Sequence, residues 1–182
     1  MKKILVVVDM QNDFISDALG TPEAQAIVDN VKKKIEEYKN RGDSIIFTQD
    51  THYDNYLDTS EGKALPVKHC VRLTDGWNIH KDLIEIMGDT EYLVIEKPTF
   101  GSVNLMWEIE DMIDFYADKD EEIEFVGLCT DICVVSNVLM AKAYYPDLKI
   151  VVDASCCAGV TPEKHKAALE VMKSCQVNVI GE

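Results

Sequence analysis

Six short apolar segments recur along the chain and are separated by longer amphipathic ones. Uninterrupted apolar runs of this length are typical of strands buried on both faces of a parallel sheet. We therefore expect strands over 3–8, 44–48, 92–96, 123–126, 148–152 and 177–180.

The segments between these strands show helical periodicity and helix-boundary residues. Thr21-Pro22 and Thr161-Pro162 each combine an N-cap residue with proline at the first helical position. The pattern predicts helices over 21–42, 80–87, 103–116, 133–143 and from 161 onward. Alternating strands and helices predict a three-layer α/β/α sandwich around a mostly parallel, Rossmann-like sheet. We expect one domain over residues 1–182.

Four chemically capable side chains directly follow different predicted strands or the turn after one. They are Asp9, Asp50, Lys97 and Cys133. Ligands of such sheets bind beyond the carboxyl ends of the strands, so these residues are expected to meet at one edge.

Cys133 is expected in the first turn of a helix that follows a strand. The positive end of the helix dipole favours a thiolate there, which suits a nucleophile. The alternative is an ordinary buried cysteine, the commoner role of this residue type. Asp9 could exchange a proton with the thiol, or could be only a strand-end residue that bonds a loop. Lys97 could hold Asp9 and lower the pKa of the thiol, or could be a surface lysine.

A second group of residues suggests a metal site. In the extended sequence Asp50-Thr51-His52 the first and third side chains point the same way. With His69 they form a ligand set suited to zinc or iron. The alternative is a metal-free loop with exposed histidines. The spacing alone is a weak signal for a metal site, because the same loop holds other carboxylates. We expect His80 and His165 to be exposed.

Composition narrows the class of partner. The formal net charge of −15 argues against nucleic acid and anionic membranes as partners. The six cysteines are expected to be reduced, because the chain shows no secretion signal and is too large to need disulfides. We therefore expect a cytoplasmic protein. The acidic run over 118–122 is interpreted as a solvated turn.

Five segments resemble the isochorismatase-like cysteine hydrolases, and within them the nicotinamidase/pyrazinamidase group. They are VVVDMQNDF (6–14), TQDTH (48–52), LPVKHCV (65–71), EKPTFGS (96–102) and GLCTDICV (127–134). The segments span most of the chain in the family's order. Two departures near the substrate pocket, Leu65 where relatives often have Trp and the 74–76 turn, put the substrate in doubt more than the chemistry.

The resemblance implies a catalytic triad of Asp9, Lys97 and Cys133. It implies an oxyanion hole formed by the N–H groups of Cys129 and Cys133, with a cis peptide bond between Leu128 and Cys129. It also implies an aromatic contact from Phe14 to the substrate. A divalent ion would be held by Asp50, His52 and His69, with Glu61 as an additional ligand; zinc is the first choice, and iron and manganese are alternatives.

The expected function is metal-dependent hydrolysis of nicotinamide, or a similar small aromatic amide, through a thioester on Cys133, with a place in NAD salvage. One alternative is a family hydrolase acting on another amide or a carbamoyl compound. Another is a non-catalytic α/β module that binds a small molecule or zinc. The sequence is also compatible with a homo-oligomer.

Overall fold

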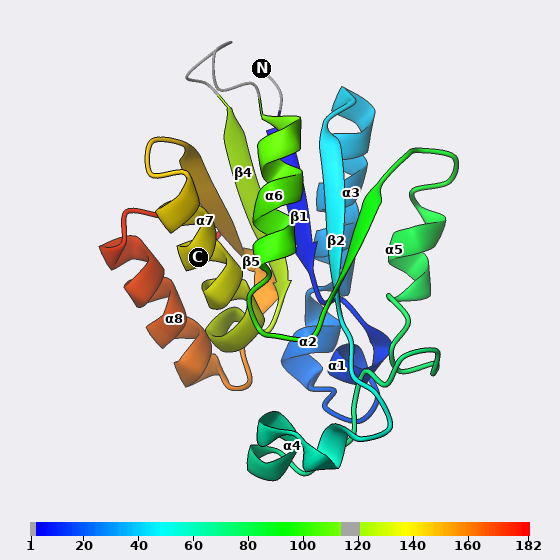
Figure 1. Cartoon of the computed structure of the whole chain (residues 1–182). Coiled ribbons are helices and arrows are strands. Elements are labelled where there is room, and N and C mark those ends of the chain that lie inside the picture. Colours follow the sequence, from blue (N-terminus) through cyan, green and yellow to red (C-terminus); the bar gives the residue numbers. More distant parts are fainter. Residues whose placement is uncertain (1–2, 114–120) are drawn as a thin grey trace.

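A six-stranded parallel sheet forms the centre of the computed structural model, which describes residues 3–113 and 121–182 (Figure 1). The strands are β1 (Lys3–Val8), β2 (Ser44–Asp50), β3 (Leu93–Lys97), β4 (Glu122–Leu128), β5 (Lys149–Ala158) and β6 (Asn178–Ile180). Their order is β3-β2-β1-β4-β5-β6, and every neighbouring pair is parallel. The predicted fold class is confirmed.

Helices cover both faces of the sheet. They are α1 (Asn12–Ile15), α2 (Pro22–Ala26), α3 (Val28–Arg41), α4 (Ser60–Ala64), α5 (Lys81–Glu85), α6 (Val103–Met112), α7 (Val135–Tyr144) and α8 (Pro162–Ser174). A 3₁₀ turn, η1 (Tyr56–Asp58), precedes α4, and a π-helical turn, η2 (Thr130–Val134), precedes α7. Among the described residues, no helix has the length and apolar character needed to cross a membrane.

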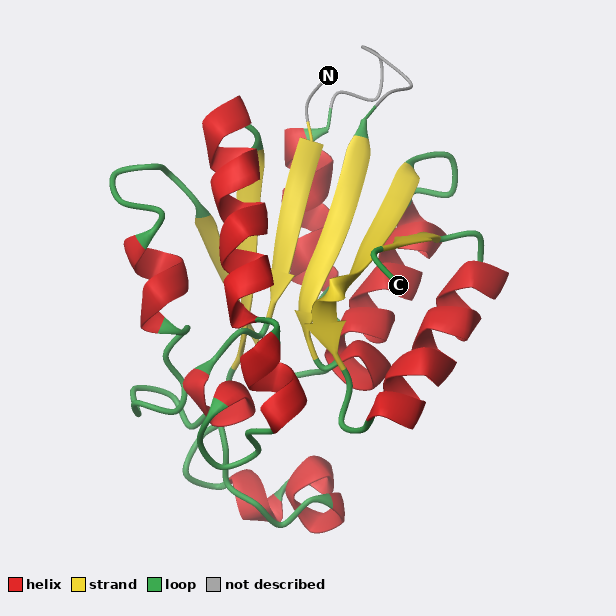
Figure 2. Ribbon diagram, turned by 180° about the vertical axis from the view of Figure 1, so that it is seen from behind, coloured by secondary structure: helices red, strands yellow, loops and turns green. Residues whose placement is uncertain are grey.

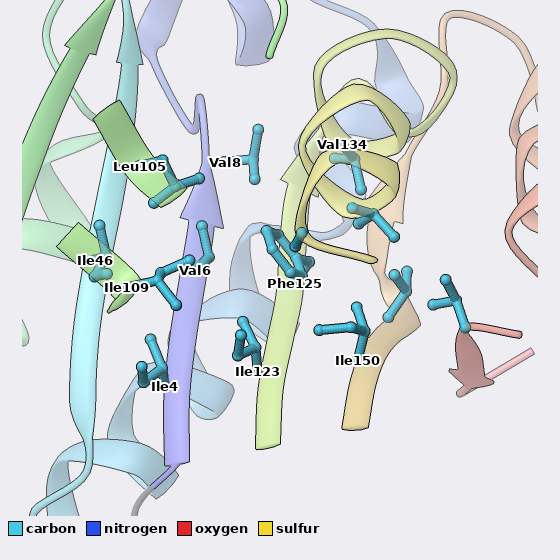
Figure 3. Packing of buried hydrophobic residues seen from close by; sticks show 14 of the residues in the cluster. Ile4, Val6, Val8, Ile46, Leu105, Ile109, Ile123, Phe125, Val134 and Ile150 are labelled. Atoms are coloured by element: carbon cyan, nitrogen blue, oxygen red, sulfur yellow. The ribbon is translucent and has the colours of Figure 1, made fainter. Parts of the chain in front are cut away.

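Alternate positions of β1 divide the core in two. Ile4, Val6 and Val8 belong to a cluster with buried side chains of α6, α7 and α8 (Figure 3). Leu5 and Val7 belong to the opposite cluster, with α2, α3 and α5. Burying each of these side chains contributes roughly 1.5–3 kcal/mol, so the central strand is fixed from both sides.

Gly127 permits the close approach of β4 to β1 near the carboxyl edge. It pairs with Val8, and its φ of +116° is one that residues with a side chain rarely adopt. A Cβ at this position would lie 2.1 Å from the carbonyl oxygen of Val8. Any larger residue would push apart the two strands that lead to Asp9 and Cys133.

Several predicted elements differ from the structure. The predicted helix over 21–42 is two helices, because the helical hydrogen bonding is interrupted at Ile27. The predicted helix over 133–143 begins at Val135, and Cys133 lies in the preceding π-turn. The helix expected over 103–116 ends at Met112, and its last expected positions, 114–116, lie outside the described residues.

The acidic run and two histidines also differ from expectation. Positions 118–120 lie outside the described residues, but Glu122 is buried and begins β4. Its carboxylate pairs with Lys3 at 2.7 Å and with Lys149, which is why it is tolerated inside the sheet. The expectation that His80 and His165 are exposed is wrong, because both are half-buried. Nδ1 of His165 lies 2.8 Å from Oγ1 of Thr130.

Candidate active site

The strand order brings the predicted chemistry to one edge. The central strand β1 lies between β2 and β4, and β3 flanks β2. Asp50 and Lys97 end β2 and β3, Asp9 follows β1, and the Cys133 turn follows β4, so all four lie at the carboxyl ends of contiguous strands. Asp50 and Lys97 are direct partners in the parallel register of β2 and β3. Both views show α1, α2 and α4 beyond this end of the sheet (Figures 1 and 2).

Asp9 is fully buried and held from two sides. Its backbone has a φ of +48°, a left-handed conformation that is uncommon outside glycine and often found at functional sites. The Thr48 hydroxyl donates to Oδ1 at 2.6 Å. Nζ of Lys97 lies 2.6 Å from Oδ2. The carboxylate is therefore oriented by one neutral donor and one charged donor.

Lys97 connects this carboxylate to the cysteine. Its side chain is 1 % exposed, and Nζ lies 3.5 Å from Sγ of Cys133. Cys133 is also buried. A buried lysine needs a partner, and Asp9 supplies it. The structure thus brings Asp9, Lys97 and Cys133 together; their catalytic roles are argued below.

The protonation of this group differs from the expected thiolate. Burial raises the pKa of the Cys133 thiol and the negative charge of Asp9 raises it further, which outweighs the lowering by Lys97. Burial likewise raises the pKa of Asp9 against the opposing charge of Lys97. A neutral thiol beside a carboxylate of raised pKa is an arrangement in which the carboxylate could accept the thiol proton.

The turn that carries Cys133 is fixed by its own backbone. The carbonyl of Cys129 accepts the N–H groups of Ile132 at 3.0 Å and Val134 at 3.1 Å. The expected cis peptide bond between Leu128 and Cys129 is present. π-helical turns are rare and occur frequently at functional sites.

Beside the triad lies a cluster of four metal-ligand side chains. Asp50, His52, Glu61 and His69 each offer one donor atom, and these atoms all lie within 4.8 Å of one another. Asp50 ends β2, His52 lies in the loop after it, Glu61 is on α4 and His69 lies in the loop that follows α4. This convergence is the one that the sequence predicted from Asp50, His52 and His69, with Glu61 added.

The donor atoms suit a cation. Nδ1 of His69 lies 2.8 Å from the carbonyl oxygen of Val67, which holds the ring with Nε2 turned to the cluster, 3.7 Å from Oε1 of Glu61. The buried Nε2 of His52 has no hydrogen-bond partner in the described part of the chain and lies 3.0 Å from Oδ2 of Asp50. Burial opposes a charge on His52, but Asp50 raises the pKa of that imidazole. A positive charge is favoured at this point, and a divalent ion would supply one.

Close packing places Glu61 and the two imidazoles. The Tyr56 ring lies 4.7 Å from the His52 ring and 5.0 Å from the His69 ring, and its hydroxyl donates to the Leu65 carbonyl at 2.9 Å. A Cβ on Gly62 would lie 2.1 Å from the Tyr56 carbonyl oxygen, so only glycine allows α4 to sit this close.

Phe14, the predicted substrate contact, is half-buried on α1. Its ring lies 5.4 Å from the ring of His69, which places an apolar surface next to the ligand cluster. A planar apolar substrate could rest on it. This role remains a prediction.

Comparison with known proteins agrees with this arrangement. The sequence model described as "Isochorismatase domain" matches residues 3–181. The chain belongs to the isochorismatase family. It is similar to the nicotinamidase of Escherichia coli, with 26% identity over 94% of this chain and 90% of that one.

Two solved structures are similar over nearly the whole chain. The nicotinamidase/pyrazinamidase of Bacillus subtilis superimposes with a TM-score of 0.84 and 25% identity, covering 99% of this chain and 100% of that one. The pyrazinamidase of Pyrococcus horikoshii in complex with zinc gives 0.82 and 25%, covering 100% of both chains. The protein is thus an isochorismatase-family hydrolase with nicotinamidases and pyrazinamidases among its relatives.

Sequence reasoning missed the residues that orient this family site. Gln11 is fully buried; its amide donates to the Asp50 carbonyl at 2.9 Å and accepts the Asp50 N–H at 2.7 Å. Asp13 accepts the N–H of Cys70 at 2.7 Å, beside the predicted ligand His69. Both lie within DMQNDF, and two polar residues so close to a buried strand end were the available signal.

Proposed function

We propose that this single domain is a metal-dependent cysteine amidohydrolase. It would convert nicotinamide, or a similar small aromatic amide, to the carboxylic acid and ammonia. The observation that supports this best is the contact of Lys97 with both Asp9 (2.6 Å) and Cys133 (3.5 Å), directly beside the ligand cluster. The family membership and the nicotinamidase relatives support the same reaction class.

In the first half-reaction the Cys133 thiol gives its proton to Asp9 and Sγ attacks the amide carbon. The N–H groups of Cys129 and Cys133 are proposed to bind the oxygen of the resulting tetrahedral species. Its collapse breaks the C–N bond, and the nitrogen leaves as ammonia with the proton returned by Asp9. The product of this half is a thioester on Cys133.

In the second half-reaction a water molecule takes the place of ammonia. Asp9 accepts a proton from this water as its oxygen attacks the thioester carbon. The C–S bond then breaks, the carboxylic acid forms, and the proton returns to Sγ. Although burial opposes its charge, Asp9 and Asp50 raise the pKa of the Lys97 ammonium group, so Lys97 stays protonated throughout.

Asp50, His52, Glu61 and His69 are proposed to hold one divalent ion. Two imidazoles with two carboxylates suit zinc, and iron or manganese would also fit. When bound, the ion would supply an electrophilic anchor for a donor atom of the substrate, such as a pyridine nitrogen. The chain's own contribution is to place Phe14 beside the ligands, 5.4 Å from His69, and so to orient an aromatic ring.

We also propose a cellular compartment and a binding partner for the protein. All six cysteines are free in the structure, and we propose that they stay reduced in the cytoplasm. The partner is a small-molecule amide. The molar mass of the protein in solution will show whether copies of the chain associate.

The test is turnover of nicotinamide by purified protein, followed as ammonia release, with elemental analysis of the same sample. We expect nicotinic acid and ammonia in equal amounts and close to one divalent ion per chain. A panel of pyrazinamide, benzamide and N-carbamoyl amino acids defines the substrate class. Folded protein that releases no ammonia from any of these amides would refute the amidohydrolase proposal.

A further inference from the structure

The side chain of Asn137 connects the turn that carries Cys133 to the segment that follows Lys97. It is fully buried on α7, one helical turn after Cys133. Its Nδ2 donates to the Cys133 carbonyl at 2.8 Å and to the Phe100 carbonyl at 3.0 Å. Its Oδ1 accepts the N–H of Ser102 at 2.9 Å. Both donor hydrogens and the acceptor are thus in use.

One end of this connection is the junction behind the nucleophile. Cys133 lies in the π-turn, and α7 begins two residues later. Backbone hydrogen bonds close at different spacings in π- and α-helices, so a carbonyl at the junction benefits from a side-chain donor. Asn137 provides that donor to the carbonyl of Cys133 itself.

The other end is the segment over 98–102, which directly follows Lys97. Ser102 is the N-cap of α6, and its hydroxyl accepts the Leu105 N–H at 3.2 Å. The segment lies close against α7, since a Cβ on Gly101 would be 3.0 Å from Cε of Met140. Asn137 therefore joins the backbone of this segment to the backbone of the nucleophile turn.

We propose that Asn137 is a positioning residue that keeps Lys97 and Cys133 in contact during the reaction. This inference rests on the proposed function of Cys133 as nucleophile. Lys97 ends β3 and Cys133 lies in the π-turn after β4, and these two strands are not neighbours in the sheet. Asn137 connects the two segments that follow these strands, on the α6 and α7 side. A displacement of about 1 Å in such a group can lower a rate about 10²-fold.

The test compares Asn137→Leu, which keeps the size and removes all three bonds, with Ser136→Ala as the matched control. Ser136 lies next to Asn137 on the same helix and packs near Gly101, but its hydroxyl donates to the Ile132 carbonyl at 2.6 Å and not to the backbone of the 98–102 segment. We expect Asn137→Leu to lower kcat about 10–100-fold with KM changed less than about threefold. Ser136→Ala should stay within about twofold of the parent.

A double-mutant cycle separates positioning from a purely structural role. The second-order rate constant for alkylation of Cys133 by iodoacetamide is measured for the parent, Asn137→Leu, Lys97→Met and the double variant. If Asn137 acts through Lys97, its substitution changes this rate constant at least about fivefold in the parent and less than about twofold in Lys97→Met. Equal factors in both backgrounds would overturn the proposal.

Two further measurements keep the result interpretable. If Asn137→Leu does not fold, Asn137→Asp replaces it, because it keeps the shape and the acceptor for Ser102 while losing the donors. Amide hydrogen exchange of residues 98–104 should increase in either Asn137 variant and not in Ser136→Ala, and unchanged exchange would contradict the link.

Coupling in the alkylation cycle without nicotinamide hydrolysis would refute the substrate alone, and hydrolysis without coupling would refute the positioning role alone.

Discussion

Nζ of Lys97 lies 3.6 Å from Oδ1 of Asp50, so the ammonium group that contacts Cys133 also contacts a residue proposed to hold the metal ion. The other oxygen of Asp50 lies 3.0 Å from Nε2 of His52. The Asp50 carboxylate thus contacts both halves of the site, through the Lys97 ammonium group and the His52 imidazole. A substitution in either half of the site is therefore expected to affect the other half through Asp50.

Replacing the nucleophile should abolish the reaction without unfolding the protein. Cys133→Ala removes a sulfur atom from a buried position and leaves the backbone turn in place. We expect no ammonia release above background because the covalent route is lost. Cys175→Ala, at an exposed cysteine, is the control and should turn over at the parent rate. Near-parent turnover by Cys133→Ala would mean that another group attacks the amide.

Removing the acid–base group should lower the chemical step. Asp9→Asn keeps the shape and the bond to Thr48 but cannot accept a proton. We expect kcat to fall roughly 10²–10⁴-fold, the usual contribution of a positioned acid–base group. Single-turnover kinetics, normalised to folded protein, measure it. A rate per folded molecule equal to the parent's would leave Asp9 with a structural role only.

Removing the charge of the lysine should have a comparable effect by a different route. Lys97→Met retains most of the buried stem and deletes the ammonium that lies 2.6 Å from Asp9. Asp9 is then buried without its cationic partner, so its pKa should rise further and stability should also fall. We expect most of kcat to be lost. Comparing the pH dependence of kcat with that of the parent checks the electrostatic cause.

Changes in the ligand cluster should affect the hydrolysis of nicotinamide more than the reactivity of the Cys133 thiol. Nicotinamide should be hydrolysed well, and benzamide, which has no ring nitrogen, at least about tenfold more slowly, in keeping with a positioning role for the ion. His52→Ala should lower both metal content and nicotinamide turnover, while Cys133 still reacts with iodoacetamide. Less than about a tenth of an ion per chain, with full activity after chelation, would eliminate the metal site.

Gly62 should control metal affinity without supplying a ligand. In Gly62→Ala the new Cβ meets the Tyr56 carbonyl, so α4 must move and carry Glu61 away from the cluster. We expect zinc affinity of the metal-free protein to fall about 10–100-fold by calorimetry, as for other residues that orient ligands. Lys63→Ala, exposed on the same helix, is the control and should bind as the parent does. Equal affinities for Gly62→Ala and the parent would exclude Glu61 as a ligand.

Stability in acid should depend on Glu122. Although burial opposes the charged form, its contacts with Lys149 and Lys3 lower the pKa of this carboxyl below its usual range. Its stabilising contribution is therefore present above the unfolded-state pKa and is lost as the pH falls through the folded-state pKa. Because both lysines are partly exposed, Glu122→Gln should reduce the free energy of unfolding at pH 7 by only about 1 kcal/mol.

Urea unfolding at several pH values checks this prediction. The difference between parent and Glu122→Gln should shrink as the pH falls from about 5 to 3, since the parent's carboxylate is then protonated. Glu36→Gln, an equal charge change on an exposed face of α3, is the control and should show no such convergence. A difference that is constant with pH would mean that Glu122 acts through packing alone.

The sheet and the strand-end chemistry could be predicted from the sequence because both depend on local patterns. An apolar run followed at once by Asp9 or Asp50 contains the strand and its functional end in a few consecutive residues. The strands nevertheless extend beyond their apolar runs: β2 continues through Gln49 and Asp50, whose polar groups are hydrogen-bonded to segments distant in sequence. Such partners leave no local signal.

The rest of the site depends on contacts between distant segments. The local pattern around Gly62 does not indicate that this residue packs against the Tyr56 carbonyl, and nothing near Asn137 indicates that its side chain reaches Ser102. The protonation of Cys133 was predicted wrongly for the same reason. A helix terminus can be expected from sequence, but the burial that raises the pKa of the Cys133 thiol arises only from tertiary packing.

The strand order also has a consequence for how activity returns during refolding. Asp9, Asp50, Lys97 and Cys133 are widely separated in the chain, and they meet only after β1 has paired with β2 on one side and β4 on the other. Parallel pairing of distant segments forms slowly because long loops must close first. No fragment that lacks one of these strands can assemble the site. Catalytic recovery should therefore coincide with the final cooperative phase of refolding, and partly folded chains should show none.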